Sequence, residues 1–81
     1  MLLTRYIRDS HRKPIGVVMS TGLNEVGYSL CNKKDAWDKE KGKMIAFRRA
    51  TGGFNHPIPD SIYIDYYSMV DRSDRYFGYG Y

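Results

Sequence analysis

The residues best suited to catalysis or metal binding are one cysteine, Cys31, and two histidines, His11 and His56. A structural zinc site needs four ligands at recurring intervals such as C-x-x-C, and no such interval occurs here. Nucleophilic catalysis by Cys31 would need a histidine base and a third group to orient it, which the spacing does not provide. The simpler interpretation treats Cys31 as a small hydrophobic residue at a strand end and both histidines as loop residues. We therefore expect no enzymatic activity, no metal site and no cofactor.

Three neighbouring carboxylates, Asp35, Asp38 and Glu40, are the candidates for a nuclease metal site. On a helix, Asp35 and Asp38 would share one face. Each has a lysine beside it on that face, Lys39 at i+4 from the first and Lys41 at i+3 from the second. Ordinary surface ion pairs are therefore the better interpretation.

The net charge of +4 is distributed unevenly. Residues 1 to 50 carry 11 Lys and Arg against 5 Asp and Glu, whereas residues 51 to 81 carry 2 against 4. A field of one sign attracts partners of the other sign, so the basic part fits phosphate or an acidic protein surface. The alternative is that Lys39, Lys41 and Lys43 form a solvated helix face that keeps a small protein in solution.

Basic and aromatic residues interleave in proteins that stack single-stranded nucleic acid. Tyr6 and Tyr28 could stack on bases, but six of the eight tyrosines lie in the acidic C-terminal third. This segregation favours two surfaces, a basic one for phosphate and a tyrosine-rich one for protein binding. The alternative for the tyrosines is that they cover the seam between helix and sheet with their hydroxyls in water. The predicted contact residues are Arg5, Arg8, Arg12, Lys13, Lys33, Lys34, Arg48, Arg49, Tyr63 and Tyr67.

Three short segments of alternating apolar and polar residues come first, over 2–8, 15–20 and 25–31. The middle segment is rich enough in β-branched residues for a central strand. A polar turn over 9–14 and a Gly-containing loop over 21–24 connect the segments. Residues 1–31 therefore predict a three-stranded antiparallel meander.

Residues 32–52 predict one helix. Asn32 can accept a hydrogen bond as the N-cap, and Gly52 or Gly53 can supply the residue with φ > 0 that ends a helix. Gly42 costs the helix about 1 kcal/mol relative to Ala, which favours a close approach to a strand or a partner; the alternative is a break into two short helices. The apolar side of this helix, expected to face the sheet, consists of Trp37, Met44, Ile45 and Phe47, with Ala36 at its edge.

The remainder predicts a loop over 53–59, where the glycine pair Gly52 and Gly53 at its start and the two prolines within it exclude a helix, and a second helix over 60–77. A strand through the tyrosine-rich run IYIDYY is the alternative, but its alternation fails at Ser68. Helical spacing, in contrast, persists for four turns through Ile62, Tyr66, Met69, Val70, Ser73 and Phe77. Residues 78–81 are expected to be a frayed tail. The expected architecture is a single α+β domain over residues 1–81, β-β-β-α-α, with both helices packed on one face of the meander.

The run SLCNKKDAWDKEKGKMIAFRRA, residues 29–50, resembles a pattern found in small bacteriophage proteins, C-x-x-K-D-x-[FW]-D-K-x-x-G-x-x-I-A-x-x-R-A. The cysteine of the pattern is Cys31, its aromatic position is Trp37 and its glycine is Gly42. Further residues look like the closing helix of that group: Pro59, Met69, Arg72, Arg75, Tyr76 and Phe77. The resemblance covers about half of the chain and brings no catalytic residue with it.

The resemblance implies a setting in which small phage proteins occupy a surface on a larger host assembly, such as a polymerase, a nuclease or a CRISPR-type defence complex. We therefore expect a non-enzymatic phage accessory protein that binds and inhibits or redirects a host protein or ribonucleoprotein complex. The alternative is a direct DNA- or RNA-binding protein. The N-terminus lacks the apolar run of a signal peptide or membrane span, so we expect a location in the host cytoplasm and no membrane partner.

Overall fold

A computed structural model describes residues 2–31, 36–52 and 57–78 of the chain. Three strands come first: β1 (Leu3–Arg8), β2 (Pro14–Gly22) and β3 (Glu25–Leu30). Helix α1 (Lys39–Thr51), a single 3-10 turn (Asp60–Ile62) and helix α2 (Tyr63–Gly78) follow. This order confirms the predicted β-β-β-α-α arrangement of an α+β domain.

The three strands form an antiparallel sheet in the order β1-β2-β3. In the central strand, Val17, Val18 and Met19 are all buried. Successive side chains of a strand point to opposite faces, so β2 is covered on both faces of the sheet. A strand of this kind needs one layer of structure above it and one below.

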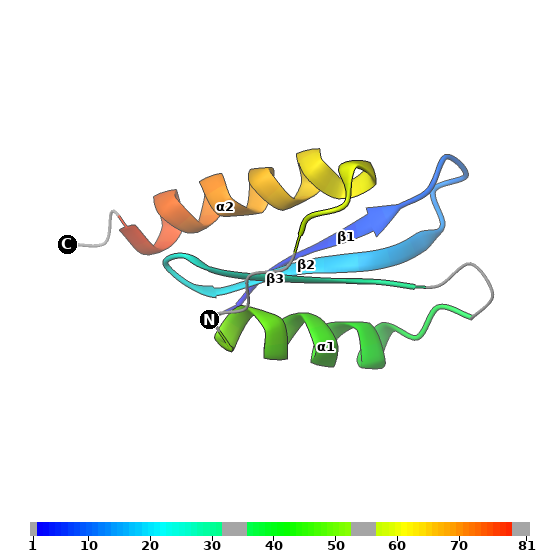
Figure 1. The fold of residues 1–81 in the computed structure, drawn as a ribbon, viewed down its shortest axis with the longest axis horizontal. Helices are drawn as coiled ribbons and strands as arrows, with labels where there is room; N and C mark the ends of the chain where they lie inside the picture. Colours follow the sequence, from blue (N-terminus) through cyan, green and yellow to red (C-terminus); the bar gives the residue numbers. More distant parts are fainter. Residues whose placement is uncertain (1, 32–35, 53–56, 79–81) are drawn as a thin grey trace.

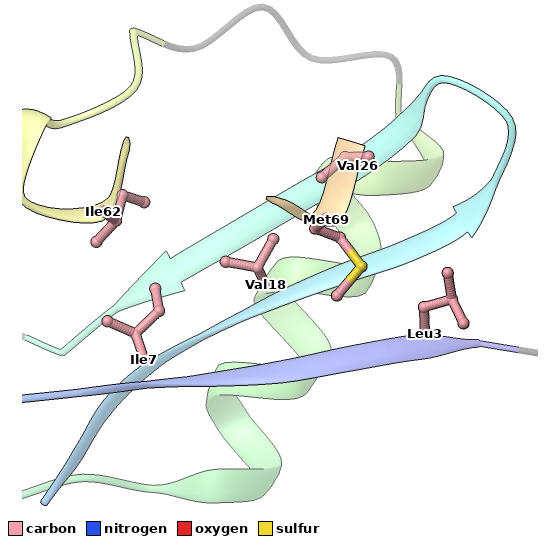
Figure 2. Close-up of a cluster of buried hydrophobic side chains, with 6 residues drawn as sticks. All are labelled: Leu3, Ile7, Val18, Val26, Ile62 and Met69. Atoms are coloured by element: carbon pink, nitrogen blue, oxygen red, sulfur yellow. The ribbon is translucent and has the colours of Figure 1, made fainter. Parts of the chain in front are cut away.

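The two helices provide these layers from opposite faces of the sheet (Figure 1). On one face, strand side chains meet Ile62 and Met69 from the α2 segment (Figure 2). On the other face, Val17 and Met19 pack against Ala46 of α1. The expectation that both helices pack on one face is therefore wrong, because β2 is apolar on both of its faces. The first cluster consists of Leu3, Ile7, Val18, Val26, Ile62 and Met69.

Helix α1 begins at Lys39, later than the sequence predicts. Its N-cap is Asp38, which has extended backbone angles and whose carboxylate accepts the Lys41 amide at 3.1 Å. The expected cap, Asn32, lies outside the described residues. The helix ends at Thr51 with Gly52 as its C-cap, and the φ of Gly52 is −81°, which is right-handed. The other glycine expected to supply a positive φ, Gly53, lies outside the described residues.

The side of α1 that faces the sheet is built from small residues. Gly42, Ala46 and Ala50, spaced four apart, are buried, whereas Met44 and Phe47 are 50% and 42% exposed. The prediction that Met44 and Phe47 face the sheet is therefore wrong. Small residues bring the helix axis close to the sheet, and larger ones at these positions would hold it away.

Gly42 lies inside a continuous helix, which excludes the predicted alternative of a break. A Cβ at Gly42 would lie 2.7 Å from the Trp37 ring and 3.2 Å from the Ser29 hydroxyl. That hydroxyl is buried and donates to the Gly42 carbonyl at 2.9 Å. The close approach expected at Gly42 is therefore to strand β3 and to the half-buried Trp37. This tryptophan packs against the cluster of Val17, Met19 and Ala46 on the α1 face of the sheet.

The second helix agrees with the sequence, and the strand alternative through IYIDYY is excluded. Ile62, Met69 and Ser73 are buried, as the helical spacing predicts. Ser73 also donates its hydroxyl to the carbonyl of Gly22, the last residue of β2, at 2.9 Å. Helix α2 continues through Gly78, the first residue of the predicted tail, and residues 79–81 lie outside the described part.

Neither of the two described helices has the length and apolar character that a membrane crossing requires.

Candidate functional site

Four tyrosines form a continuous chain of ring contacts from the outer edge of β3 to the exposed side of α2. Tyr28 meets Tyr66 edge to face with ring centroids 6.2 Å apart, and Tyr66 meets Tyr67 in the same manner at 5.3 Å. The ring centroid of Tyr67 lies 4.5 Å from that of Tyr63, which is one turn earlier on the helix. The inner two rings belong to the packed part of the fold and therefore hold the outer two in place.

Hydrogen bonds fix the inner rings. The Tyr66 hydroxyl donates to the Val26 carbonyl at 3.4 Å, and the Tyr28 hydroxyl donates to the Pro57 carbonyl at 3.1 Å. Burial raises the pKa of Tyr66 above its ordinary value, and the neighbouring Tyr67 and Tyr28 raise it further. The Tyr66 hydroxyl therefore keeps its proton at neutral pH and remains a donor.

Tyr63, Ile64 and Tyr67 form the exposed end of this chain, and we call these three residues the aromatic stripe. Their exposed fractions are 54%, 78% and 46%. Tyr67 lies one helical turn from each of the other two, so the three side chains are neighbours. A rigid apolar stripe with tyrosine hydroxyls is typical of residues that dominate the energy of protein interfaces.

Carboxylates border the aromatic stripe along α2. Asp71 and Asp74 follow Tyr67 by four and seven residues, which places them on the same side of the helix, and both are exposed. Asp71 accepts a hydrogen bond from Arg75 at 2.6 Å. Residues 60–78 carry four Asp against two Arg, so this segment has a formal net charge of −2.

Two of the predicted basic contacts serve the fold. Arg5 donates from Nε to Asp65 Oδ1 at 2.9 Å and so links β1 to α2. Arg49 donates from Nη1 to the Tyr28 carbonyl at 3.0 Å, and its guanidinium lies 5.3 Å from the centre of the Tyr28 ring. Both arginines have partners that a ligand phosphate would have to displace.

The other basic contacts are dispersed. Arg8 donates to the Arg12 carbonyl at 2.9 Å within the β1–β2 turn, where Arg12 and Lys13 are exposed. Arg48 is exposed near the C-terminal end of α1, which lies at the opposite end of the sheet (Figure 1). The structure therefore does not gather these residues into one basic patch. Lys33 and Lys34 lie outside the described residues.

The two tyrosines considered for base stacking lie on opposite faces of the sheet. Tyr6 packs against the cluster of Val17, Met19 and Ala46, and the Lys39 ammonium lies 5.7 Å from the centre of its ring. Tyr28 packs against Tyr66 beneath α2. Because each ring is engaged under a different helix, the two do not form a common stacking platform.

A hollow of about 460 Å³ lies between the end of β3 and the start of α1, and its wall includes Cys31, Trp37, Asp38 and Lys41. The Asp38 carboxylate is already used to cap α1. Within the described part of the chain, no histidine lines the hollow and no cluster of metal-ligating side chains occurs. His56 lies outside the described residues.

Tyr63 and Tyr67 are among the contact residues predicted from the sequence and both are exposed, whereas the exposed Ile64 is not among them. The signal was present, because Ile64 falls outside the set of helical positions that runs from Ile62 through Met69 to Ser73. An isoleucine that the helical period places in water, with tyrosines on either side, marks an exposed apolar surface.

No protein-family model matches the chain, and no curated protein or solved structure is significantly similar to it.

Proposed function

We propose that this chain is a non-enzymatic accessory protein of a bacteriophage, which binds a nucleic-acid-handling or defence assembly in the host cytoplasm and inhibits or redirects it. The phage setting rests on the resemblance of residues 29–50. The binding role rests on one observation, the exposure of 78% of Ile64 between Tyr63 and Tyr67. We place the binding energy in this aromatic stripe, because rigid aromatic and aliphatic side chains lose little entropy when they are buried at an interface.

The acidic border of the stripe favours a partner with basic residues around an apolar depression. Surfaces that hold DNA or RNA are rich in Lys and Arg, and the exposed Asp74 offers a carboxylate to such residues, whereas Asp71 would first have to exchange its bond to Arg75. Insertion of α2 into that surface would exclude the nucleic acid. The basic N-terminal part of the sequence favours phosphate or an acidic protein surface, whereas the acidic residues of α2 favour a basic partner for this side.

Direct nucleic-acid binding is the second candidate, and the exposed Arg12 and Lys13 of the β1–β2 turn favour it. Two adjacent cations make few phosphate contacts, so the affinity would be low and would fall steeply with salt. The dispersion of the other basic residues makes this candidate the weaker one.

The test compares two double variants in a capture experiment from nuclease-treated bacterial host lysate, with quantitative mass spectrometry. Ile64→Ser with Tyr67→Ser removes the apolar part of the stripe. Met44→Ser with Phe47→Ser is the matched control, because these side chains have similar exposure on α1. We expect the wild type and the control to retain the same host protein and the stripe variant to lose it.

Equal recovery by the stripe variant would contradict the proposal, as would capture of the host protein only from lysate that was not treated with nuclease. A titration with a fluorescent oligonucleotide between 50 and about 200 mM salt separates the second candidate, since a steep dependence on salt that Arg12→Ser reduces would support it.

A further inference from the structure

The two outer edges of the sheet differ in how their backbone groups are satisfied. On β3, the Val26 carbonyl accepts from the Tyr66 hydroxyl and the Tyr28 carbonyl accepts from Arg49. Side chains therefore cap this edge, which is one way in which proteins prevent pairing with another strand. The edge of β1 has no such caps among the residues that the structure describes.

The register identifies which groups of β1 are free. Val26 and Tyr28 direct their carbonyls away from β2, so the β3 residues that alternate with these two form the hydrogen bonds to β2. Every second residue of β2 takes part in these bonds, and the β2 residues between them bond to β1. Carried across the sheet, this alternation leaves the N–H and C=O groups of Thr4 and Tyr6 pointing away from β2. In the described ranges, no other segment donates to or accepts from these groups.

A groove runs beside this open edge on the α2 side. Its volume is about 450 Å³, and it is lined by Leu3, Arg72, Arg75 and Tyr76. Leu3 is nearly buried and forms an apolar floor, whereas Arg72 is exposed. The groove thus has the features that accompany strand addition: open backbone groups, an apolar floor and polar walls.

The charge along the edge is positive. Arg5, Arg72 and Arg75 lie on the α2 side, and Lys39 lies over Tyr6 on the α1 side. Two carboxylates oppose them, Asp65 bound to Arg5 and Asp71 bound to Arg75. Four cations against two anions leave an excess that favours an acidic ligand.

We propose that the open edge of β1 binds an extended acidic protein segment, which adds as a fourth strand through the backbone of Thr4 and Tyr6. This site is separate from the aromatic stripe and does not depend on the proposed function. A second copy of the chain is a poorer occupant, because antiparallel pairing of two β1 strands would bring Arg5 and Arg72 of both copies together, and like charges across a strand pair destabilise it.

The first test uses the wild-type chain and two synthetic peptides, the acidic TEVEVEVT and the basic TKVKVKVT, at about 150 mM salt. Calorimetry measures the affinity, and hydrogen exchange by NMR measures the protection of individual amides. We expect saturable binding of the acidic peptide only, with amide exchange at Thr4 and Tyr6 slowed at least about tenfold.

Two variants separate the backbone and charge contributions. Thr4→Pro removes an outward N–H without removing a bond to β2, and proline is tolerated at such edge positions; it should weaken acidic-peptide binding about tenfold. Arg72→Glu should weaken it about threefold to tenfold, whereas Arg48→Glu, the matched control on α1, should change it less than about twofold. The Arg72 measurement stands even if Thr4→Pro does not fold.

Equal binding of both peptides, no binding of the acidic peptide at millimolar concentration, or protection of amides away from β1 would overturn the proposal. Sedimentation of the free protein as a dimer, with Thr4 and Tyr6 already protected, would assign the edge to a second copy and also overturn it.

Discussion

Gly27 of β3 lies directly against the backbone of Ala46 in α1. A side chain at Gly27 would collide with the Ala46 carbonyl and with the Ala50 amide. Glycine at this position and the small residues of α1 therefore form one contact, in which helix and strand backbones touch. This contact sets the distance between α1 and the sheet.

Gly27→Ala should destabilise the protein by about 1–3 kcal/mol, because the added methyl group meets backbone that cannot rotate away. Gly42→Ala is the control, since its nearest neighbour is the outer end of the Trp37 ring and Ala favours the helix by about 1 kcal/mol. Urea denaturation should show a clearly smaller loss for Gly42→Ala, and the fluorescence of Trp37, the single tryptophan, should move to longer wavelength. Equal stability losses would show that α1 can move away from β3.

Ser73→Ala should destabilise the protein by about 1 kcal/mol more than Ser68→Ala. Both changes lie on α2 and have the same effect on helix propensity, but only the buried Ser73 hydroxyl donates to the Gly22 carbonyl. Thermal unfolding of the two variants measures the difference. If Ser73→Ala and Ser68→Ala destabilise the protein equally, the hydrogen bond between α2 and the end of β2 contributes nothing to stability.

Asp38→Ala should cost about 1 kcal/mol, because it removes the carboxylate that accepts the Lys41 amide at the start of α1. Asparagine is a comparable N-cap, so Asp38→Asn should keep most of the stability. Denaturant unfolding and the exchange rate of the Lys41 amide measure both variants. Unchanged exchange in Asp38→Ala would mean that the helix begins elsewhere.

The β1–β2 turn should loosen only in strong acid. Hydrogen bonds from the Lys13 amide and then the His11 amide hold the pKa of Asp9 below its ordinary value of 3.8. The contribution of the ionised form is complete above 3.8 and is lost as the pH falls through the lower value in the folded protein. The chemical shift of the Lys13 amide, followed by NMR, should titrate with a midpoint below 3.8, and Asp9→Asn should abolish this titration. A midpoint above 3.8 would contradict the hydrogen bonds.

The sheet and the second helix could be predicted because their patterns are local. Alternation identifies the strands, and the spacing from Ile62 to Ser73 identifies α2. The opposite placement of the helices could not be derived in this way, because alternation in β2 shows that both faces are apolar without showing which helix covers each. Helix α1 was harder still, since its buried residues are Gly and Ala, whose small size carries little hydrophobic signal.

The candidate site was predictable only in part. Composition indicated exposed tyrosines, and Tyr63 and Tyr67 are exposed. Arg5 and Asp65 are 60 positions apart in the sequence, and Arg49 and Tyr28 are 21 positions apart. No spacing rule predicts contacts over such separations. The same holds for the difference between the two sheet edges, which follows from the side chains that reach β3 and not β1.

Photo-crosslinking from inside the aromatic stripe measures whether this surface contacts a host protein. A benzophenone amino acid replaces Ile64 in one variant and Met44, on the opposite helix, in another; both are irradiated in host lysate and the products are identified by mass spectrometry. We expect one dominant protein crosslink from position 64 that excess unlabelled wild-type chain abolishes, and none of comparable yield from position 44. Crosslinking from position 44 but not 64, or to nucleic acid in place of protein, would contradict it.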